Sequence, residues 1–122
     1  MIETTAFQNA HLPGGLVIEE IEFLSVPMVG GIGRPATART IINQGRLRIH
    51  LQAGADDTEF SVSLYHEVLE TATVWADDPP LEVIQFNEGD FERTVREAYK
   101  RLEPASPRTL RLLLKNHGFR KD

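Results

Sequence analysis

The feature that most constrains the fold is the separation of two hydrophobic periodicities along the chain. Residues 16–52 show the alternation of apolar and polar side chains that is typical of strands, whereas residues 57–117 repeat apolar residues at helical spacing. Strand signals therefore come early and helix signals late, which segregates the elements into layers and disfavours a βαβ arrangement. The sequence predicts one α+β domain over residues 1–122, with a small, mainly antiparallel sheet followed by three helices.

The N-terminal part of the chain contains the first predicted strand. Residues 16–28 are rich in apolar and β-branched side chains, with Pro27 close to their end. Residues 1–15 finish in a Pro-Gly-Gly sequence and are expected to form an irregular arm. Residues 30–35 contain three glycines but no following Lys-Ser or Lys-Thr pair, which favours a connecting loop over a phosphate-binding loop.

A hairpin provides the next two predicted strands. Residues 37–42 and 46–52 flank Asn43-Gln44-Gly45, which predicts a three-residue loop with glycine at a positive φ angle. Apolar and polar residues alternate in the second strand, so one of its faces is expected to be buried and the other wet. His50 falls on the polar face, where it is expected to be solvated.

The first helix is predicted to run from about residue 57 to Thr73, with the Asp56-Asp57-Thr58 sequence supplying its N-cap. At 100° per residue, its apolar side chains fill an arc of roughly 200°. A helix this apolar is mostly buried, and its narrow polar strip either faces solvent or forms the floor of a cleft. That strip consists of Glu59, Ser63, His66, Glu67 and Glu70.

Two further helices are predicted after a break. Residues 75–80 contain two aspartates and two prolines, which end the first helix, and residues 81–86 are expected to be a short extended piece. The second helix is predicted from Asp90, as its N-cap, to Glu103-Pro104. The third begins at Ser106-Pro107 and ends at Gly118.

An HExxE motif, His66-Glu67-Val68-Leu69-Glu70, lies on the polar strip of the first helix. Residues four apart lie one helical turn apart, so His66 and Glu70 point the same way and can share a metal ion. Glu67 projects beside them, where a general base for a metal-bound water is needed. The chain contains no cysteine, so any metal must be held by His, Asp or Glu.

A hydrolytic metal site needs about three protein ligands and an open position for water. Glu92 is the expected third ligand, because it borders the apolar stripe of the second predicted helix and can reach inward. Glu88, in the loop before that helix, and Asp90 are alternatives. Zinc or another divalent metal is the expected cofactor, and two carboxylate ligands shift the preference toward harder ions.

The hairpin, the helix with HExx(H/E) and the second helix with a ligand Glu together resemble a minimal zincin of the gluzincin type, over about residues 37–103. The resemblance implies a metallopeptidase whose motif helix supplies two ligands and the general base, and in which a strand edge holds an extended peptide. On this chain His66 matches the first ligand, Glu67 the base and Glu92 the third ligand. Glu70 replaces the usual second histidine, which weakens the acidity that the metal confers on water.

Two other functional classes are compatible with the sequence. One is a non-catalytic zincin-like domain that binds a partner without metal, with the HExxE residues as a solvated helix face. The other is a nucleic-acid-binding or regulatory module, because residues 93–122 carry a net charge of +6 against −11 for residues 1–92. Such a basic segment more often balances an acidic half of the same protein, so nucleic acid is not the favoured partner.

The chain shows no apolar run near the roughly 20 residues that cross a bilayer, and its start lacks the basic region of a signal peptide. We therefore expect a cytoplasmic protein that does not attach to a membrane and that acts on a peptide or protein substrate. The sequence leaves the oligomeric state open.

Overall fold

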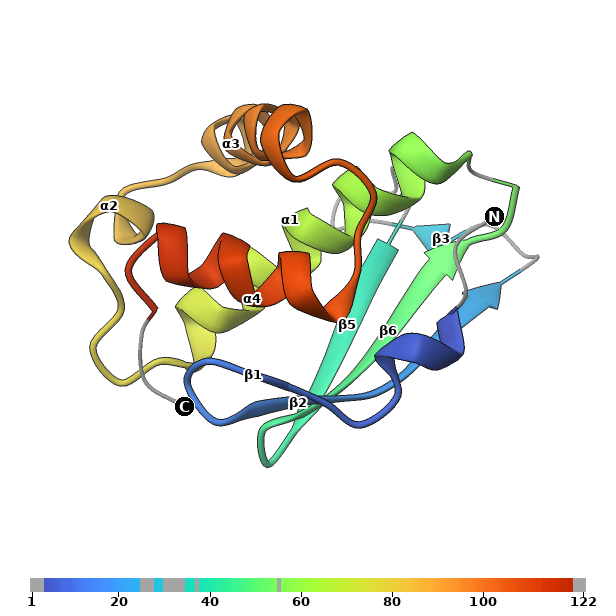
Figure 1. Cartoon of the computed structure of the whole chain (residues 1–122), viewed down its shortest axis with the longest axis horizontal. Helices are drawn as coiled ribbons and strands as arrows, with labels where there is room; N and C mark the ends of the chain where they lie inside the picture. The colour runs from blue at the N-terminus through green and yellow to red at the C-terminus, as the bar shows by residue number, and fades with distance from the viewer. Residues whose placement is uncertain (1–3, 25–27, 30–34, 37, 55, 120–122) are drawn as a thin grey trace.

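Sheet and helices form separate layers in the structure, a computed structural model that describes residues 4–24, 28–29, 35–36, 38–54 and 56–119 (Figure 1). Four strands pair in the order β1 (Ala10–Leu12), β2 (Leu16–Leu24), β6 (Arg46–Gln52) and β5 (Ala38–Asn43). The outer pairs β1–β2 and β5–β6 are antiparallel, whereas the central pair β2–β6 is parallel. The predicted α+β class with a mainly antiparallel sheet is confirmed.

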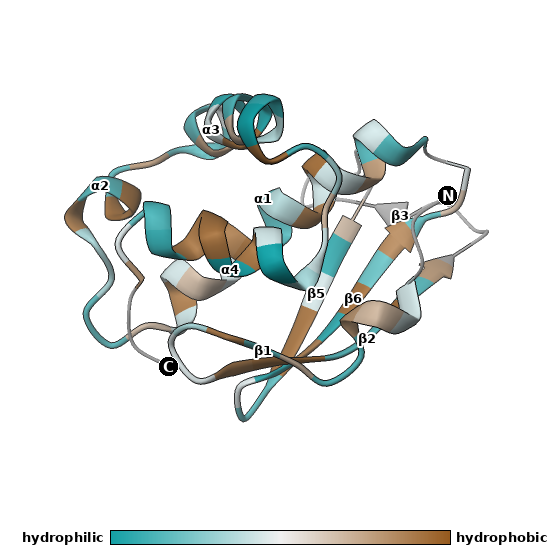
Figure 2. Ribbon diagram, in the orientation of Figure 1, coloured by the Kyte–Doolittle hydropathy of each residue, from teal (hydrophilic) through white to brown (hydrophobic). Residues whose placement is uncertain are grey.

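Three longer helices cover one face of this sheet: α1 (Asp57–Trp75), α3 (Glu88–Leu102) and α4 (Pro107–Asn116) (Figure 1). Helices α1 and α4 contact the strands, and α3 packs on α1 and α4 as an outer layer. Figure 2 shows the corresponding difference in hydropathy: α3 is largely hydrophilic, whereas much of α4 is hydrophobic. The core between the layers includes the fully buried Leu47, Ile49, Leu64, Val68, Leu69, Leu110 and Leu114.

The β5–β6 hairpin is confirmed, with a shorter loop than predicted. Asn43 pairs with Arg46, so the loop consists of two residues, Gln44 and Gly45. Both have positive φ angles, 53° and 80°, as in the type I′ turn, whose twist matches that of the flanking strands. The three-residue prediction was wrong because it did not foresee that Asn43 would remain in the ladder. His50 lies on the polar face, as predicted, and is partly exposed.

Strand β2 contains a β-bulge that the alternating pattern did not predict. The register shifts between Ile18 and Glu20, which leaves Glu19 as the extra residue. Consequently both acids reach arginines of β6: Glu19 lies 2.9 Å from Arg46, and Glu20 pairs with Arg48. The bulge therefore shifts by one residue which side chains of β2 are buried. The carboxylates of Glu19 and Glu20 both stay on the outer face of the sheet.

Residues 4–12 do not form the irregular arm that the sequence predicted. Thr4–Phe7 is a 3-10 helix, η1, and Ala10–Leu12 is β1, paired with β2. Phe7 and Leu12 are buried, so this segment closes one edge of the core. A three-residue strand is too short to show an alternating pattern, and its geometry comes from pairing with β2.

Helix α1 begins and ends close to its predicted limits. Asp56 is the N-cap, and its carboxylate accepts a hydrogen bond from the backbone N–H of Glu59 at 2.8 Å. The helix ends at Trp75, before the segment that contains Pro79 and Pro80. The predicted first helix is thus confirmed, with two further residues at its C-terminus.

The region after α1 differs from the prediction at two points. Leu81–Ile84 forms a short helix, α2, in place of an extended piece. Helix α3 begins at Glu88, with Asn87 as its N-cap in place of Asp90. Asn87 and Asp90 form a capping box, in which each side chain accepts the other's backbone N–H, and this satisfies two donors where Asp90 as N-cap would satisfy one. Helix α4 follows Ser106, as predicted.

Strands β3 (Met28–Val29) and β4 (Pro35–Ala36) form a separate antiparallel pair. The predicted glycine-containing loop between them lies outside the described residues. Within the described ranges, no helix has the length and apolar character needed to span a membrane.

Candidate metal centre

Helices α1 and α3 together position a polar cluster around His66. The polar strip of α1 contributes His66, Glu67 and Glu70, and the first two turns of α3 contribute Glu88 and Glu92. Because Glu88 and Glu92 are four residues apart, they lie on one face of α3. Both reach His66, so this face is the one that packs against α1.

Two carboxylates from different helices meet at Nε2 of His66. Oε2 of Glu88 lies 3.1 Å from this nitrogen, and Oε2 of Glu70 lies 3.5 Å from it. One ligand atom of each of these three residues lies within 4.8 Å of the other two. Bonds of about 2.1 Å to a tetrahedral ion place neighbouring ligand atoms about 3.4 Å apart. The separations at Nε2 therefore suit a single divalent ion.

The other ring nitrogen of His66 faces Glu92. Oε1 of Glu92 lies 3.3 Å from Nδ1, and Oε2 accepts a hydrogen bond from Nε of Arg96 at 2.6 Å. In a neutral ring with its proton on Nδ1, Glu92 would hold that proton and the lone pair would lie on Nε2, as is common for metal-binding histidines. The ring of Phe91 lies 5.8 Å from the imidazole, centroid to centroid, and limits its rotation.

The group that the structure brings together is His66, Glu70 and Glu88, whereas the sequence predicted Glu92 as the third member. Glu92 is adjacent to His66 but contacts the opposite ring nitrogen. Glu88 reaches Nε2 because α3 begins before Asp90, which places Glu88 in the first helical turn. Asp90, the other alternative, is occupied by the capping box and by Arg93. The ligand role of Glu92 stays a prediction.

The cluster shifts the acidity of its own members. The pKa of His66 is raised to about 9, chiefly by its hydrogen bond to Glu70, against the opposing effect of burial. His66 in turn lowers the pKa of Glu70, whereas the pKa of Glu88 is raised, chiefly by its hydrogen bond with Glu70. Among the described residues no Arg or Lys pairs with Glu70 or Glu88. A proton and a metal ion therefore compete for the same position at Nε2.

Glu67 points toward β5, away from these contacts. Its Oε1 accepts a hydrogen bond from Oγ1 of Thr40 at 2.8 Å. Burial raises the pKa of Glu67, although the hydrogen bond from Thr40 opposes the change. A carboxylate with a raised pKa is a stronger base, as proton transfer from water near neutral pH requires. Sequence reasoning missed Thr40; the available signal was its place opposite the buried Ile49 in the hairpin.

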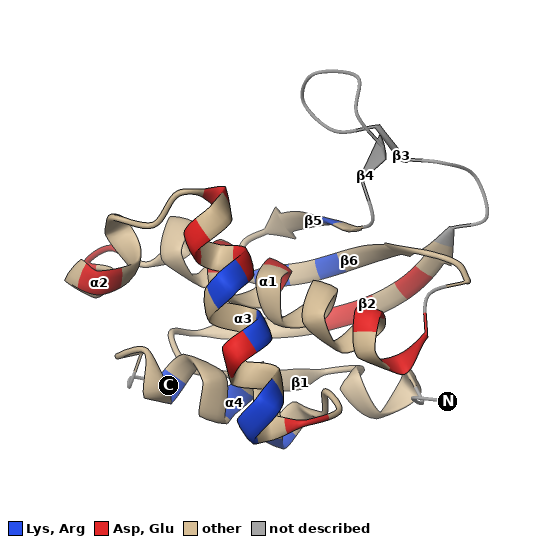
Figure 3. Ribbon diagram, turned by 90° about the horizontal axis from the view of Figure 1, so that it is seen from above, with Lys and Arg blue, Asp and Glu red and all other residues tan. Residues whose placement is uncertain are grey.

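The basic residues of α3 are largely paired with acids. Lys100 lies 3.2 Å from Glu97, and Arg96 contacts both Glu92 and Glu59. Figure 3 shows the resulting alternation of positive and negative residues along α3. This helix therefore does not present the uniform basic stripe that is typical of nucleic-acid-binding surfaces.

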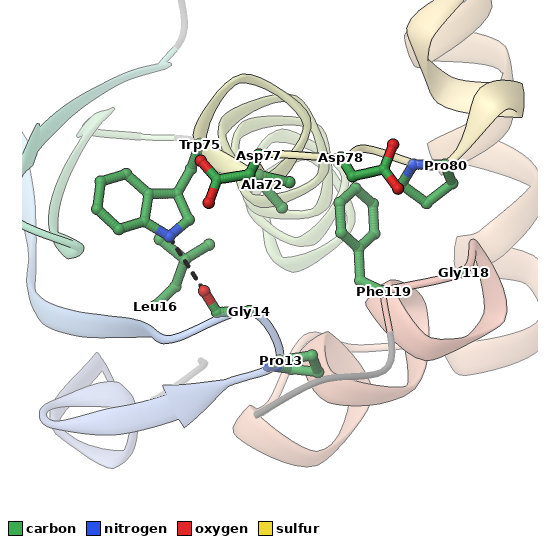
Figure 4. Close-up of a pocket in the computed structure, with 11 residues that line it drawn as sticks. Pro13, Gly14, Leu16, Ala72, Trp75, Asp77, Asp78, Pro80, Gly118 and Phe119 are labelled. Atoms are coloured by element: carbon green, nitrogen blue, oxygen red, sulfur yellow. Dashed lines mark hydrogen bonds between the residues drawn. The ribbon is translucent and has the colours of Figure 1, made fainter.

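A cavity of about 860 Å³ lies at the C-terminal end of α1, beside Trp75 (Figure 4). Trp75 follows His66 by nine residues, which is about two and a half turns and places it on the opposite side of the helix. His66, Glu70 and Glu88 do not line this cavity. The charged cluster and the cavity are separate features.

No family model, curated protein or solved structure matches this chain. Its function therefore has to be inferred from the geometry of its own residues.

Proposed function

We propose that this chain is a zincin-like, metal-dependent hydrolase of peptide bonds in which His66, Glu70 and Glu88 bind a divalent ion. The strongest support is the meeting of two carboxylates from two helices at Nε2 of His66. An isolated HExxE motif would give only an ion pair within one helix, which contributes about 0.2–0.5 kcal/mol. The second helix adds a ligand group that local sequence spacing alone does not provide.

Each residue around His66 has a distinct role in this proposal. Glu92 keeps the proton of His66 on Nδ1, so that Nε2 stays available. Glu67 is the general base in this proposal: its carboxylate, which accepts a hydrogen bond from Thr40 on the side of β5, turns toward the ligand cluster to take a proton from the attacking water and returns that proton to the leaving amine. A bound divalent ion would polarise the substrate carbonyl and acidify the water.

Thermal melts of metal-free protein with added Zn²⁺ or Mn²⁺ test the binding site. An ion that binds only the folded state raises Tm by mass action. His66→Ala should abolish the rise, and Glu88→Gln should remove most of it. Glu92→Gln should weaken binding only about 10- to 100-fold, as expected of a residue that orients a ligand. Glu97→Gln, on the same helix but paired with Lys100, is the matched control and should keep the full rise.

Two outcomes of these melts would change the assignment. Equal rises in wild type and His66→Ala would show adventitious binding elsewhere. If Glu92→Gln abolished the rise while Glu88→Gln kept it, Glu92 would be the third ligand. Hydrolysis of a fluorogenic peptide library is the separate test of chemistry: Glu67→Gln should keep the rise in Tm and lose hydrolysis.

Metal affinity should also increase with pH, because the metal must displace the proton on Nε2. With a pKa of about 9 for His66, the apparent affinity at pH 7 should be about 100-fold below its value for the deprotonated site. Titrations of one ion at several pH values measure this slope, and His66→Ala should remove it.

A non-catalytic domain is the second candidate, and the raised pKa of His66 favours it. A protonated imidazole can offset part of the negative charge of Glu70 and Glu88 without any metal, so the cluster would then serve only to join α1 to α3. This candidate predicts no metal-dependent change in Tm, whereas a loss of stability on His66→Ala in metal-free protein is expected of both candidates.

A further inference from the structure

The cavity at the C-terminal end of α1 has the size of a small-molecule site. Its volume of about 860 Å³ falls within the range of roughly 300–1,000 Å³ that is typical of ligand pockets. Three distant parts of the chain form its walls: the turn between β1 and β2, the end of α1 with the segment after it, and the residues that follow α4. Leu16, Ala72 and Phe119 lie beneath the cavity and are themselves buried, whereas Trp75 is 40% exposed and supplies accessible apolar surface.

Trp75 is fixed in the wall of this cavity while its ring stays accessible. Its indole N–H donates a hydrogen bond to the carbonyl oxygen of Gly14 at 3.0 Å (Figure 4). On the hairpin side, a Cβ added to Gly45 would lie only 3.3 Å from the ring, so the indole packs closely against that turn. The side chain is nevertheless 40% exposed. The indole is therefore held in a preformed position, with its polar atom already satisfied.

Two carboxylates flank the apolar surface. Asp77 and Asp78 line the cavity, and Figure 4 shows Asp77 toward Trp75 and Asp78 toward Pro80 and Phe119. Both side chains are exposed, and neither has a hydrogen-bond or ion-pair partner among the described residues. An aromatic wall beside two carboxylates that pair with no described residue is complementary to a cation on an apolar body, through cation–π and ionic contacts.

We propose that this cavity binds a small organic cation, an aromatic or aliphatic body that carries one ammonium or guanidinium group. The apolar body packs against the exposed ring of Trp75, and the charged group pairs with the carboxylate of Asp77, which lies toward that ring. The site is independent of the proposed metal centre, because it shares no residue with the cluster around His66 and lies on the other side of α1.

The chain contains a single tryptophan, so Trp75 fluorescence reports this cavity selectively. The probes are phenethylamine, phenethyl alcohol and phenylacetate, which share a ring and differ in charge. We expect saturable changes in Trp75 emission, with the amine binding on the order of fivefold to tenfold more tightly than the alcohol, and the acid most weakly. The amine's advantage should shrink with added salt. Chemical-shift changes at the amide of Gly118 give a second, label-independent readout.

In the double variant Asp77→Asn, Asp78→Asn, phenethylamine should bind only as tightly as phenethyl alcohol. The weak binding that comes from the ring shared by all three probes should remain. Glu22→Gln combined with Glu97→Gln removes the same charge from exposed positions outside the cavity and should keep the full preference. Metal-binding tests on the aspartate variant should be unchanged, which separates this site from the proposed hydrolase. The proposal is overturned if no probe binds, if amine and alcohol bind equally, or if the aspartate variant keeps the preference.

Discussion

The two faces of helix α1 satisfy their polar groups in opposite ways. On the face toward α4, buried hydroxyls have neutral partners: Tyr65 donates to the carbonyl of Glu103 at 2.8 Å, and Ser61 accepts the backbone N–H of Ala105 at 2.9 Å. On the face toward α3, the carboxylates of Glu70, Glu88 and Glu92 surround the imidazole of His66. The first arrangement stabilises the fold at any ordinary pH. The second stabilises it only while Nε2 carries a proton or a metal ion.

The largest expected effect lies on the buried face. Leu64→Ala or Leu69→Ala should lower the free energy of unfolding by about 2–5 kcal/mol, because each removes a fully buried side chain and leaves a cavity. Urea unfolding measures the change. Val74→Ala, on the same helix but 80% exposed, is the control and should change stability by less than about 0.5 kcal/mol. Similar losses in all three would contradict the contrast between the faces.

The polar face should show a strong pH dependence in metal-free protein. The pKa of His66 is about 9 in the folded state, above the ordinary value of 6.5, so the folded protein holds a proton that the unfolded chain releases. This stabilisation is fully present below pH 6.5 and is lost as pH rises to about 9, with a total of about 3 kcal/mol. Urea midpoints across this window measure it. The same slope in His66→Ala would assign the effect to other groups.

The neutral network should show a smaller, pH-independent effect. Tyr65→Phe removes a hydroxyl that contacts the Glu103 carbonyl and lies 3.0 Å from Thr109, and leaves these buried groups short of a partner. We expect a loss of about 1–3 kcal/mol in the free energy of unfolding. Tyr99→Phe, whose hydroxyl contacts the exposed Thr58, is the matched control and should lose less. A loss in Tyr65→Phe that varied strongly between pH 6 and pH 9 would break the comparison.

The smallest effect on folding is expected at Glu67. Burial raises its pKa, so the ionised carboxylate is disfavoured in the folded protein and its contribution to stability falls as pH increases through that pKa. Glu67→Gln keeps an acceptor for Thr40 and removes the charge, so stability at neutral pH should be unchanged or slightly higher. A clear decrease in Tm would show that the carboxylate is needed for folding.

Several features set by local chemistry were predictable from the sequence, although the capping box at Asn87 and Asp90 was not. Asp56 and Ser106 cap helices because their side chains accept backbone N–H groups close in sequence. The hairpin turn follows from Gly45, and the apolar face of α1 follows from residue spacing alone. These features depend on neighbours within a few residues, which a single sequence displays.

Features that depend on distant contacts were not predictable. Strand β1 exists through its pairing with β2, and the bulge at Glu19 appears only when β2 is aligned with β6. The same reason explains the candidate site. The motif located His66 and Glu70, but the choice between Glu88 and Glu92 depended on where α3 begins and how it faces α1. The cavity joins three segments that are far apart in sequence, so no local pattern indicates it.

The parallel pairing of β2 with β6 has a consequence for the order of folding. The β5–β6 hairpin closes through a two-residue turn, and hairpins of this kind form in about 1–10 μs. Strand β2 must instead reach β6 across residues 25–45, so its docking pays a larger loop-closure entropy before any contact is gained. Until β2 docks, one edge of strand β6, whose alternate side chains are apolar, stays unpaired and open to another chain. Substitutions that slow this docking, such as those at the Glu19 bulge, should therefore increase aggregation during refolding more than they lower the stability of the native protein.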